Sequence, residues 1–579
     1  MSGGGRPAER LRPGVAVTPL RAGLHLRGRG AGVTLEGSAA LPRLWELLAP
    51  RLGAAPAPAE GGAPPAPAVA AALDALAERL REQDLLVPAD EGAGAAPWPA
   101  AAAGDPVAAT ARLGAARPVV SAAAPTGPLA AALLRALAAA DAVPEARTGP
   151  GLPPGLALVT AAGPTGPVAV AVGRTADGGF VSAPGAPRAV RATARALADR
   201  LRVPGPGRSA GGSGTAVGTE LLAGAAAHRL LCAVAGLPDP AAHEEDLRFG
   251  LPGVAAVLLT EDRPPRAAHH PWAPGGPDAG PAPGEPGGLA EALRRVSVLT
   301  DARLGALPEA AAGALPQLPA ALVACPVPSG ILLAGAARTD LARLEAACRS
   351  AELHLAAGPG ARTGLVVGAG AGHARGRALR RAARYGPEAG AALPEEVWRE
   401  HPQARHWWRV LTRRQGRRAE VTVRPLGDGA AFLAVVRAEP VAPATGPLRV
   451  VARAVEATAA DAVAFAALAA VTRTMAARSG RVGFRHTGTG GAAAPLVAAG
   501  AGPAGRRDEG WTDTWLAGVA DREARLLAAL DGLTGHLTRP VPTGERPLER
   551  ALAASGFAVL SIGPEPAPGR RPHPDGGER

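Results

Sequence analysis

The sequence predicts a multidomain α/β protein whose first ninety residues form a winged-helix unit, with three short strands followed by helices. Apolar and polar residues alternate along 23–27 and 32–37, which is the period of a strand, and Gly28-Arg29-Gly30 supplies a turn between them. Val69, Leu73, Leu76 and Leu80 recur at helical spacing. A length of 579 residues leaves room for two or three further domains.

Within this unit we expect strands at Gly14–Leu20, Gly23–Arg27 and Gly32–Gly37, helices at Leu41–Leu52 and Val69–Glu82, and a possible returning strand at Leu85-Leu86-Val87. The run from Gly53 to Pro67 is rich in proline, so no helix is expected through it.

These elements, carried by "RLRPGVAVTPLRAGLHLRGRGAGVTLEG", "LPRLWELLAPRL" and "ALDALAERLREQDLLV", resemble the PqqD-like recognition domain of peptide-modifying pathways. The resemblance implies that the leader of a ribosomally made precursor adds a strand to a sheet edge and lies in a groove beside the last helix. Mapped onto this chain, the implied peptide-binding residues are Gly32, Val33, Thr34, Leu35, Glu36, Leu73, Leu76, Arg79, Leu80 and Arg81. In that family a middle helix stands where this chain has its proline-rich run.

A DNA-binding winged helix is the alternative for this unit, because the net charge is +12. The chain has no lysine, so its positive charge comes from arginine. DNA readers place several basic residues on the recognition helix. The helix at Val69–Glu82 instead mixes arginines with Asp74, Glu78 and Glu82, so we expect a peptide partner and no nucleic acid.

Cys232, Cys325 and Cys348 are too few and too far apart for a disulfide framework or a four-thiolate zinc site, and all three are expected to be buried. No signal peptide and no uncharged apolar span of 18 residues is evident, so we expect a cytoplasmic protein without membrane contact.

A second domain is expected over residues 107–273, after a linker at 91–106. A buried strand at Pro118–Ala122 and a helix at Leu129–Ala140 predict the opening βα unit of a nucleotide-binding fold, and βα alternation predicts an open parallel sheet. Further elements are expected at Leu156–Thr160, Val168–Val172, Ala189–Leu201, Thr219–Ala235 and Val254–Leu259.

The order of these elements before "LLTEDRPPRAAHHPW" resembles ThiF-like, E1-type adenylating domains. Ala122-Ala123-Ala124-Pro125 replaces the glycine-rich phosphate loop, and no lysine is present, so the resemblance implies a degenerate Rossmann-like domain without a nucleotide cofactor. His269-His270 near Asp262 could bind a metal, but no third ligand completes a site, and surface histidines are the simpler interpretation.

After a second linker at 274–288, the segment "GILLAGAARTDLARLEAACRSAELHLAAG" resembles the entry to a YcaO domain, the ATP-dependent cyclodehydratase that forms azolines. The resemblance implies spaced glutamates that hold magnesium and nucleotide. Only Glu345 and Glu352 are present, with Arg349 and His354 among them, so a degenerate α+β docking domain is expected over 289–570, without metal, and a tail at 571–579.

Later elements are a basic, tryptophan-rich helix in "PEEVWREHPQARHWWRVL", a hairpin closed at Gly427–Gly429, and a helix capped near Thr458 or Asp461 that runs to Arg478. A helix and strand in "ERALAASGFAVLSI" precede Pro564-Glu565-Pro566-Ala567-Pro568, which matches the proline-rich tail of many YcaO enzymes.

Together these patterns predict a non-catalytic, leader-binding scaffold for thiazole and oxazole formation in thiopeptide-like or bacteriocin pathways. Its expected partners are the precursor leader and a separate YcaO cyclodehydratase, with a homodimer left open. One alternative is a fused cyclodehydratase that acts on Cys, Ser or Thr with ATP through Glu345 and Glu352, and another is the DNA-binding regulator.

Overall fold

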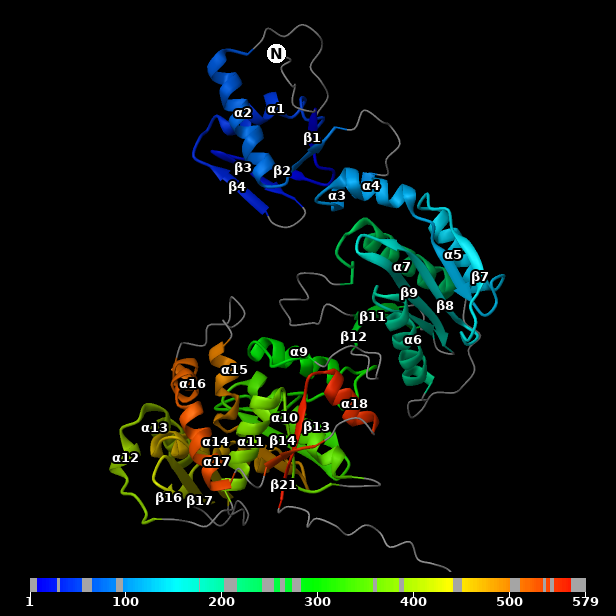
Figure 1. Ribbon diagram of the computed structural model, residues 1–579. Coiled ribbons are helices and arrows are strands. Elements are labelled where there is room, and N and C mark those ends of the chain that lie inside the picture. The colour runs from blue at the N-terminus through cyan, green and yellow to red at the C-terminus, as the bar shows by residue number, and fades with distance from the viewer. Residues whose placement is uncertain are drawn as a thin grey trace, which may run out of the picture. The chain divides into compact units, whose positions relative to one another are not determined.

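The computed structural model describes residues 8–28, 32–54, 65–89, 97–175, 178–202, 216–241, 255–260, 266–272, 283–357, 362–384, 390–440, 450–499, 511–534, 538–541 and 546–563 (Figure 1). The chain divides into two compact units. The first comprises Met1–Ala194, Ser209–Pro240 and Leu259–Ala267, and the second comprises Arg195–Arg208, Ala241–Leu258 and Ala268–Arg579. The proline-rich tail at 564–568 and the terminal 571–579 lie outside the described residues.

The N-terminal part of the first unit contains the three strands and both helices that the sequence predicts. An antiparallel sheet of order β2-β3-β4 packs with two helices, and a separate pair, β1 with β5, brings the chain back beside its start. The first strand is shorter than expected, the first helix ends four residues early, and β1 was not predicted. The bounds are β1 (Glu9–Leu11), β2 (Ala16–Leu20), β3 (Gly23–Arg27), β4 (Gly32–Glu36), α1 (Leu41–Leu48), α2 (Pro67–Glu82) and β5 (Leu86–Pro88).

The core of this part is small and made almost wholly of leucine. Leu24 and Leu26 of β3 are fully buried and face the stripe of α2 that the sequence marks as apolar. Their alternation with His25 and Arg27 fixes which face of the sheet packs on the helices, because a slip of one residue would expose both leucines.

The expected linker at 91–106 contains structure. Helix α3 (Pro97–Ala102) lies inside it, and Asp105 caps α4 (Pro106–Ala115) by accepting a hydrogen bond from the Ala108 backbone N–H. Residues 90–96 lie outside the described part. Of the second linker only 283–288 are described, immediately before α9 (Leu289–Leu299).

The expectation of an open parallel sheet after this point is wrong. The seven-stranded sheet has the order β12-β11-β10-β9-β8-β6-β7, and among the strand pairs from β6 to β10 only β6 with β7 is parallel. The predicted βα unit is present as β6–α5–β7. The following strands β8, β9 and β10 are joined by short turns, as antiparallel neighbours are. The elements are β6 (Val119–Ala122), α5 (Pro128–Ala138), β7 (Glu145–Thr148), β8 (Leu156–Gly163), β9 (Gly166–Thr175), β10 (Gly178–Val181), α6 (Pro187–Arg202), α7 (Ala216–Ala235), β11 (Ala255–Thr260) and β12 (Arg266–Pro271).

The second unit is α+β, with three small sheets of order β13-β14-β19, β15-β21-β20 and β16-β17-β18. The hairpin β16–β17 closes at Gly427–Gly429 as predicted, and Thr458 is the N-cap of α14. Its elements are α9 (Leu289–Leu299), β13 (Ala321–Val327), β14 (Gly330–Ala336), α10 (Thr339–Leu355), β15 (Leu365–Gly368), α11 (Ala371–Ala383), α12 (Glu396–Arg399), α13 (Pro402–Arg409), a π-helical turn (Val410–Arg414), β16 (Arg417–Leu426), β17 (Ala431–Pro440), β18 (Val450–Glu456), α14 (Ala459–Arg478), β19 (Arg485–Gly488), a 3₁₀ turn (Gly491–Ala493), α15 (Ala494–Ala499), α16 (Trp511–Asp521), α17 (Glu523–Thr534), β20 (Thr538–Pro540), α18 (Pro547–Ala554) and β21 (Ala558–Ile562).

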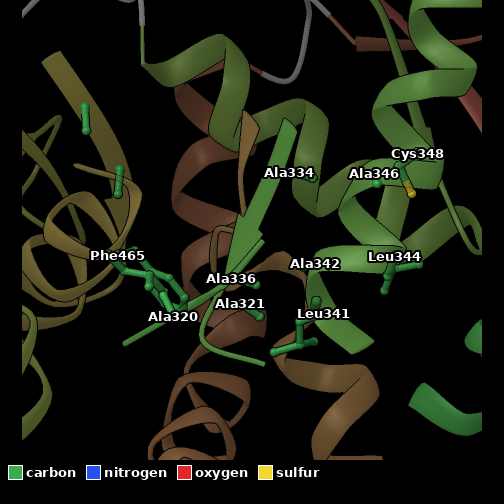
Figure 2. Close-up of a cluster of buried hydrophobic side chains, with 14 of the residues drawn as sticks. Ala320, Ala321, Ala334, Ala336, Leu341, Ala342, Leu344, Ala346, Cys348 and Phe465 are labelled. Carbon is green, nitrogen blue, oxygen red and sulfur yellow. The ribbon is translucent and has the colours of Figure 1, made fainter. Parts of the chain in front are cut away.

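Small side chains allow close packing at the centre of this unit. Alanines of β13 and β14 belong to the same buried cluster as Leu341 and Leu344 of α10 and Phe465 of α14 (Figure 2). The apolar face of α10 is buried along its whole length, from Leu341 to Leu355, which holds that helix rigidly and thereby fixes the polar side chains that it carries.

Two of the described helices, α7 and α14, are long and apolar enough to cross a membrane by length and composition alone. Within the protein, 56% of the apolar window of α7 and 89% of that of α14 is buried. Both helices therefore have the burial of core helices.

Candidate functional site

Strand β4 lies at an edge of the N-terminal sheet, and no other described strand pairs with its outer side. The Gly37 N–H donates to the Ala22 carbonyl at 3.3 Å. Because bonded and non-bonded pairs alternate along an antiparallel ladder, the backbone groups of Gly32, Thr34 and Glu36 point away from β3. These outward groups are the template that a further strand would need.

The opposite edge of the same sheet is less suitable. Pro19 lies in β2 and has no N–H to donate, and the same alternation places position 19 on the outer side of its strand. The sheet therefore has one blunted edge and one open edge, and the open edge is the strand that the sequence singled out.

The three predicted groove leucines are not at the surface. Leu73, Leu76 and Leu80 are 1–5% exposed and belong to the domain's own core. The helical arginines are at the surface and are already paired: Arg79 with Glu82 at 2.7 Å, and Arg81 with Glu9 at 2.8 Å and with Glu78. Strand β4 and helix α2 thus lie in one domain, but the three leucines pack in its core and hold α2 in place, so they do not form an exposed groove.

A buried arginine ties this domain to α3. The Arg12 side chain is 1% exposed, and it pairs with Asp84 and donates to the carbonyl oxygens of Ala100 at 3.0 Å and Ala103 at 2.5 Å. The last carbonyls of a helix lack intrahelical donors, so Arg12 satisfies the end of α3. Helix α3 is therefore packed on the N-terminal sheet and its helices as part of the same domain.

The second unit contains a cavity of about 430 Å³, a volume typical of small-ligand sites. Its polar lining comes from α10, α11, β18, α14, β19 and the loop after β19. The charged and histidine side chains that line it are Glu345, Arg349, Glu352, His373, Arg377, Arg380, Arg381, Arg384, Arg453, Arg473 and His486.

Both glutamates that the sequence singled out face this cavity, and both are engaged. Glu352 lies within ion-pair distance of Arg349 at 2.6 Å and of Arg377 and Arg381 at 3.1 Å. Burial alone raises the pKa of Glu352, but the three guanidinium groups outweigh burial and hold that pKa below its ordinary value. Glu345 pairs with Arg377 and accepts a hydrogen bond from the Thr487 hydroxyl at 2.6 Å.

A second ion-pair group lies deeper. Arg380 joins Glu456 at 2.9 Å and Glu523 at 2.6 Å, and all three side chains are at most 10% exposed. The Gly491 N–H donates to Glu456 at 2.8 Å, and a Cβ at this glycine would stand 2.4 Å from the carboxylate. Glycine is thus required for the backbone to approach Glu456 so closely.

The two histidines of the cavity have lowered pKa values, chiefly because they are buried. Burial, with Arg377 and Arg380 nearby, lowers the pKa of His373 to about 3, and burial with Arg473 lowers that of His486 to about 3. Both imidazoles are therefore neutral near pH 7. The His373 Nδ1 accepts the Ala369 N–H at 3.1 Å, which orients its ring.

Sequence reasoning missed most of this site. Arg377, Arg380, Arg381 and Arg384 stand at i, i+3, i+4 and i+7, so they form one stripe of α11, and residues 486–490 of "HTGTGG" also line the cavity. The helical spacing was visible in the sequence. A basic stripe is usually a solvated face, however. Here Arg377 and Arg381 pair with the two glutamates of α10, and Arg380 pairs with Glu456 and Glu523.

The other predicted candidates have no shared site. All three cysteines are buried as expected; burial raises the pKa of Cys232 and of Cys325 to about 11 and that of Cys348 to about 12. His269 and His270 lie on β12, and the Nδ1 of His270 stands 3.0 Å from Asp301. Among the described residues no group of three His, Cys, Asp or Glu side chains is placed to hold a metal ion.

Comparison with known proteins finds a distant structural likeness. No protein-family model matches the chain, and no curated protein matches it. A solved structure described as a heterocyclase in complex with substrate and cofactor is similar, with 12% identity and a TM-score of 0.44 over 96% of this chain and 94% of that chain.

Proposed function

We propose that this protein is a leader-peptide-binding scaffold for azoline formation, without catalysis of its own. It binds the leader of a ribosomal precursor along the open edge of β4 and presents the precursor to a separate YcaO cyclodehydratase, which forms the thiazoline and oxazoline rings. The main support for this proposal is the open edge of β4. It belongs to a sheet whose other edge strand, β2, contains Pro19 and so lacks one outward N–H.

Strand addition would use the outward backbone groups of Gly32, Thr34 and Glu36 for affinity. The side chains of Val33 and Leu35 point toward the core and keep the strand in register. Arg79, whose partner Glu82 is half-exposed, is the side chain of α2 most able to exchange its ion pair for an acidic residue of the leader.

A scaffold of this kind contributes to the rate through effective concentration. Holding the leader makes each successive cyclisation of one precursor effectively intramolecular, at roughly millimolar local concentration for a short flexible link. The core peptide then reaches the partner enzyme repeatedly without leaving the complex.

The engaged glutamates favour a scaffold over the fused cyclodehydratase. A magnesium site needs carboxylate oxygens that are open to the ion. Glu345 and Glu352 are instead held by Arg349, Arg377 and Arg381. The DNA-binding alternative loses support similarly, since both arginines of α2 are paired with acidic residues.

The test is calorimetric titration of the full chain with the synthetic leader of any ribosomal precursor found encoded near its gene. We expect micromolar affinity or better, and no phosphate release from ATP by the protein alone with precursor present. Thr34→Pro removes the central outward N–H without removing a bond to β3, so it should weaken leader binding at least tenfold.

Thr34→Val is the matched control. It keeps the N–H and, like the proline variant, removes the hydrogen bond between Thr34 and His25. Equal leader affinity in the proline variant and the wild type, with the fold intact by circular dichroism, would refute binding at β4. ATP turnover without a partner enzyme would refute the scaffold and favour the cyclodehydratase.

A further inference from the structure

The exposed face of the N-terminal sheet carries opposite charges at the two ends of its open edge. Residues directly opposite each other in an antiparallel pair share a face, so Arg27 of β3 lies beside Gly32 at one end of β4, and Glu36 lies beside Gly23 at the other. Both charged side chains are exposed, and neither has an ion pair or side-chain hydrogen bond among the described residues. One end of the edge is therefore positive and the other is negative.

A glycine lets the positive charge reach the edge. Gly32 has no side chain, so no side chain of β4 separates Arg27 from a strand added outside it. Two strand spacings are about 10 Å, a distance that an extended arginine and a glutamate span together. The His25 ring leans into the same space, because a Cβ on Gly32 would stand 2.8 Å from its Cε1.

This charge pattern is complementary to itself. In an antiparallel pair of two β4 strands centred on Thr34, Gly32 of each copy lies opposite Glu36 of the other. Each Glu36 then faces Arg27 of the other copy across Gly32, and the contact occurs twice because a two-fold interface repeats every contact. The outward backbone groups of positions 32, 34 and 36 pair in the same register.

Other pairings of two β4 strands are less favourable. A parallel pair in register places Glu36 of one copy beside Glu36 of the other, and like charges on adjacent strands are destabilising. An antiparallel shift of two residues moves Glu36 away from the position opposite Gly32. The other edge of the sheet lacks the N–H of Pro19, so the pairing closes as a dimer and does not extend into a fibre.

We propose that two copies of this chain pair through β4 as an antiparallel dimer, held by Glu36–Arg27 contacts between the copies, and that a bound leader displaces the second copy. The displacement rests on the proposed function, because leader and second copy need the same backbone groups, whereas the dimer itself does not. Two five-residue strands form an interface below the roughly 1,200 Å² of total area typical of stable complexes, so the dimer is weak. A leader of micromolar affinity therefore replaces the second copy.

The test is sedimentation velocity of the full chain at low salt, from about 1 to about 200 μM. We expect a reversible dimer with a Kd on the order of 10–100 μM, and only monomer at saturating leader. Arg27→Glu and Glu36→Arg each place like charges at both contacts, so each should weaken the dimer about tenfold. Arg43→Glu reverses an exposed charge on α1, outside the sheet, and should leave the Kd within about twofold.

A mixture of the two charge variants separates a lost contact from a damaged fold. Arg27→Glu and Glu36→Arg chains self-associate weakly, but one chain of each restores opposite charges at both contacts. A mixed dimer should therefore form with about the affinity of the wild type, detected by sedimentation with a fluorophore on one variant. A misfolded variant cannot show this recovery.

Monomers at the highest concentration, in a protein that binds leader, would refute the dimer and leave the scaffold standing. A dimer that both charge variants retain unchanged, or a mixture without recovery, rules out pairing through β4. A dimer that persists at saturating leader rules out the displacement. If the charge variants behave as expected but no leader binds, the scaffold fails and the dimer stands, so the two failures are distinguishable.

Discussion

The Arg377 Nη2 lies 3.1 Å from the Glu352 Oε1, and the same guanidinium pairs with Glu345 two turns away on α10. One cation thereby joins two nearly buried carboxylates, exposed by 8% and 3%, to helix α11. Removing it would leave both carboxylates with less compensation, and breaking a buried ion pair costs about 3–5 kcal/mol. We expect Arg377→Gln to lower the free energy of unfolding of the second unit by about that amount, measured by urea denaturation.

Arg343→Gln serves as the control for this change, because the side chain is exposed on the same helix and its loss should alter stability by less than about 0.5 kcal/mol. Similar stabilities of the two variants would contradict the view that Arg377 is the cation that holds α10 and α11 together.

Glu352 should make the second unit sensitive to acid. Its folded-state pKa lies below the unfolded value, so its contribution to stability is complete above about pH 4 to 5 and is lost as the pH falls through the folded-state pKa. Wild type and Glu352→Gln should therefore differ in unfolding free energy at pH 6, and the difference should shrink steadily toward pH 3. Parallel stability curves over this range would exclude an ionised, arginine-bound Glu352.

The elements were predictable where the chain folds locally. The β16–β17 hairpin and its Gly427–Gly429 turn follow from alternation and turn residues, and the stripe of Leu73, Leu76 and Leu80 marks the buried side of α2. Periodicity identifies the face of a helix that packs, but not what it packs against. In a small domain the apolar face of α2 is needed for the domain's own core, so these leucines do not line a peptide groove.

Long-range pairing determines the features that the sequence analysis predicted wrongly or missed. Leu158 of β8 faces Ser121 of β6 in antiparallel register, although β6 and α5 alone are equally compatible with a parallel sheet. The stripe Arg377–Arg384 was visible at helical spacing, but Arg377 is held by Glu345 and Glu352, which lie 32 and 25 residues earlier. Arg380 is held by Glu456 and Glu523, which lie 76 and 143 residues later. Local periodicity carries no information about such a contact.

The cysteines should be unreactive in the folded protein. With pKa values of about 11 for Cys232 and Cys325 and about 12 for Cys348, roughly one thiol in a thousand or fewer is ionised at pH 8, and only the thiolate is nucleophilic. A thiol reagent such as DTNB should detect no cysteine within minutes in buffer and three per chain in guanidinium chloride. Rapid reaction of any thiol in buffer would show that its helix or strand opens locally.

Arg12 should hold α3 against the N-terminal domain. Its guanidinium supplies Asp84, Ala100 and Ala103 with hydrogen bonds from a side chain that is 1% exposed, across up to 91 residues of sequence. Arg12→Met keeps the length and apolar stem but leaves these acceptors without donors, at about 1–3 kcal/mol for each buried one. We expect faster amide hydrogen exchange in α3 and a lower free energy of unfolding of the first unit, with exchange in α10 unchanged.

Arg43→Met, which breaks the exposed pair with Glu46, is the matched control and should change neither the exchange of α3 nor the free energy of unfolding. Equal exchange of α3 in both variants would mean that α3 is held by its apolar contacts alone, whereas selective release in Arg12→Met would make this arginine the link between the N-terminal domain and the helices that follow it.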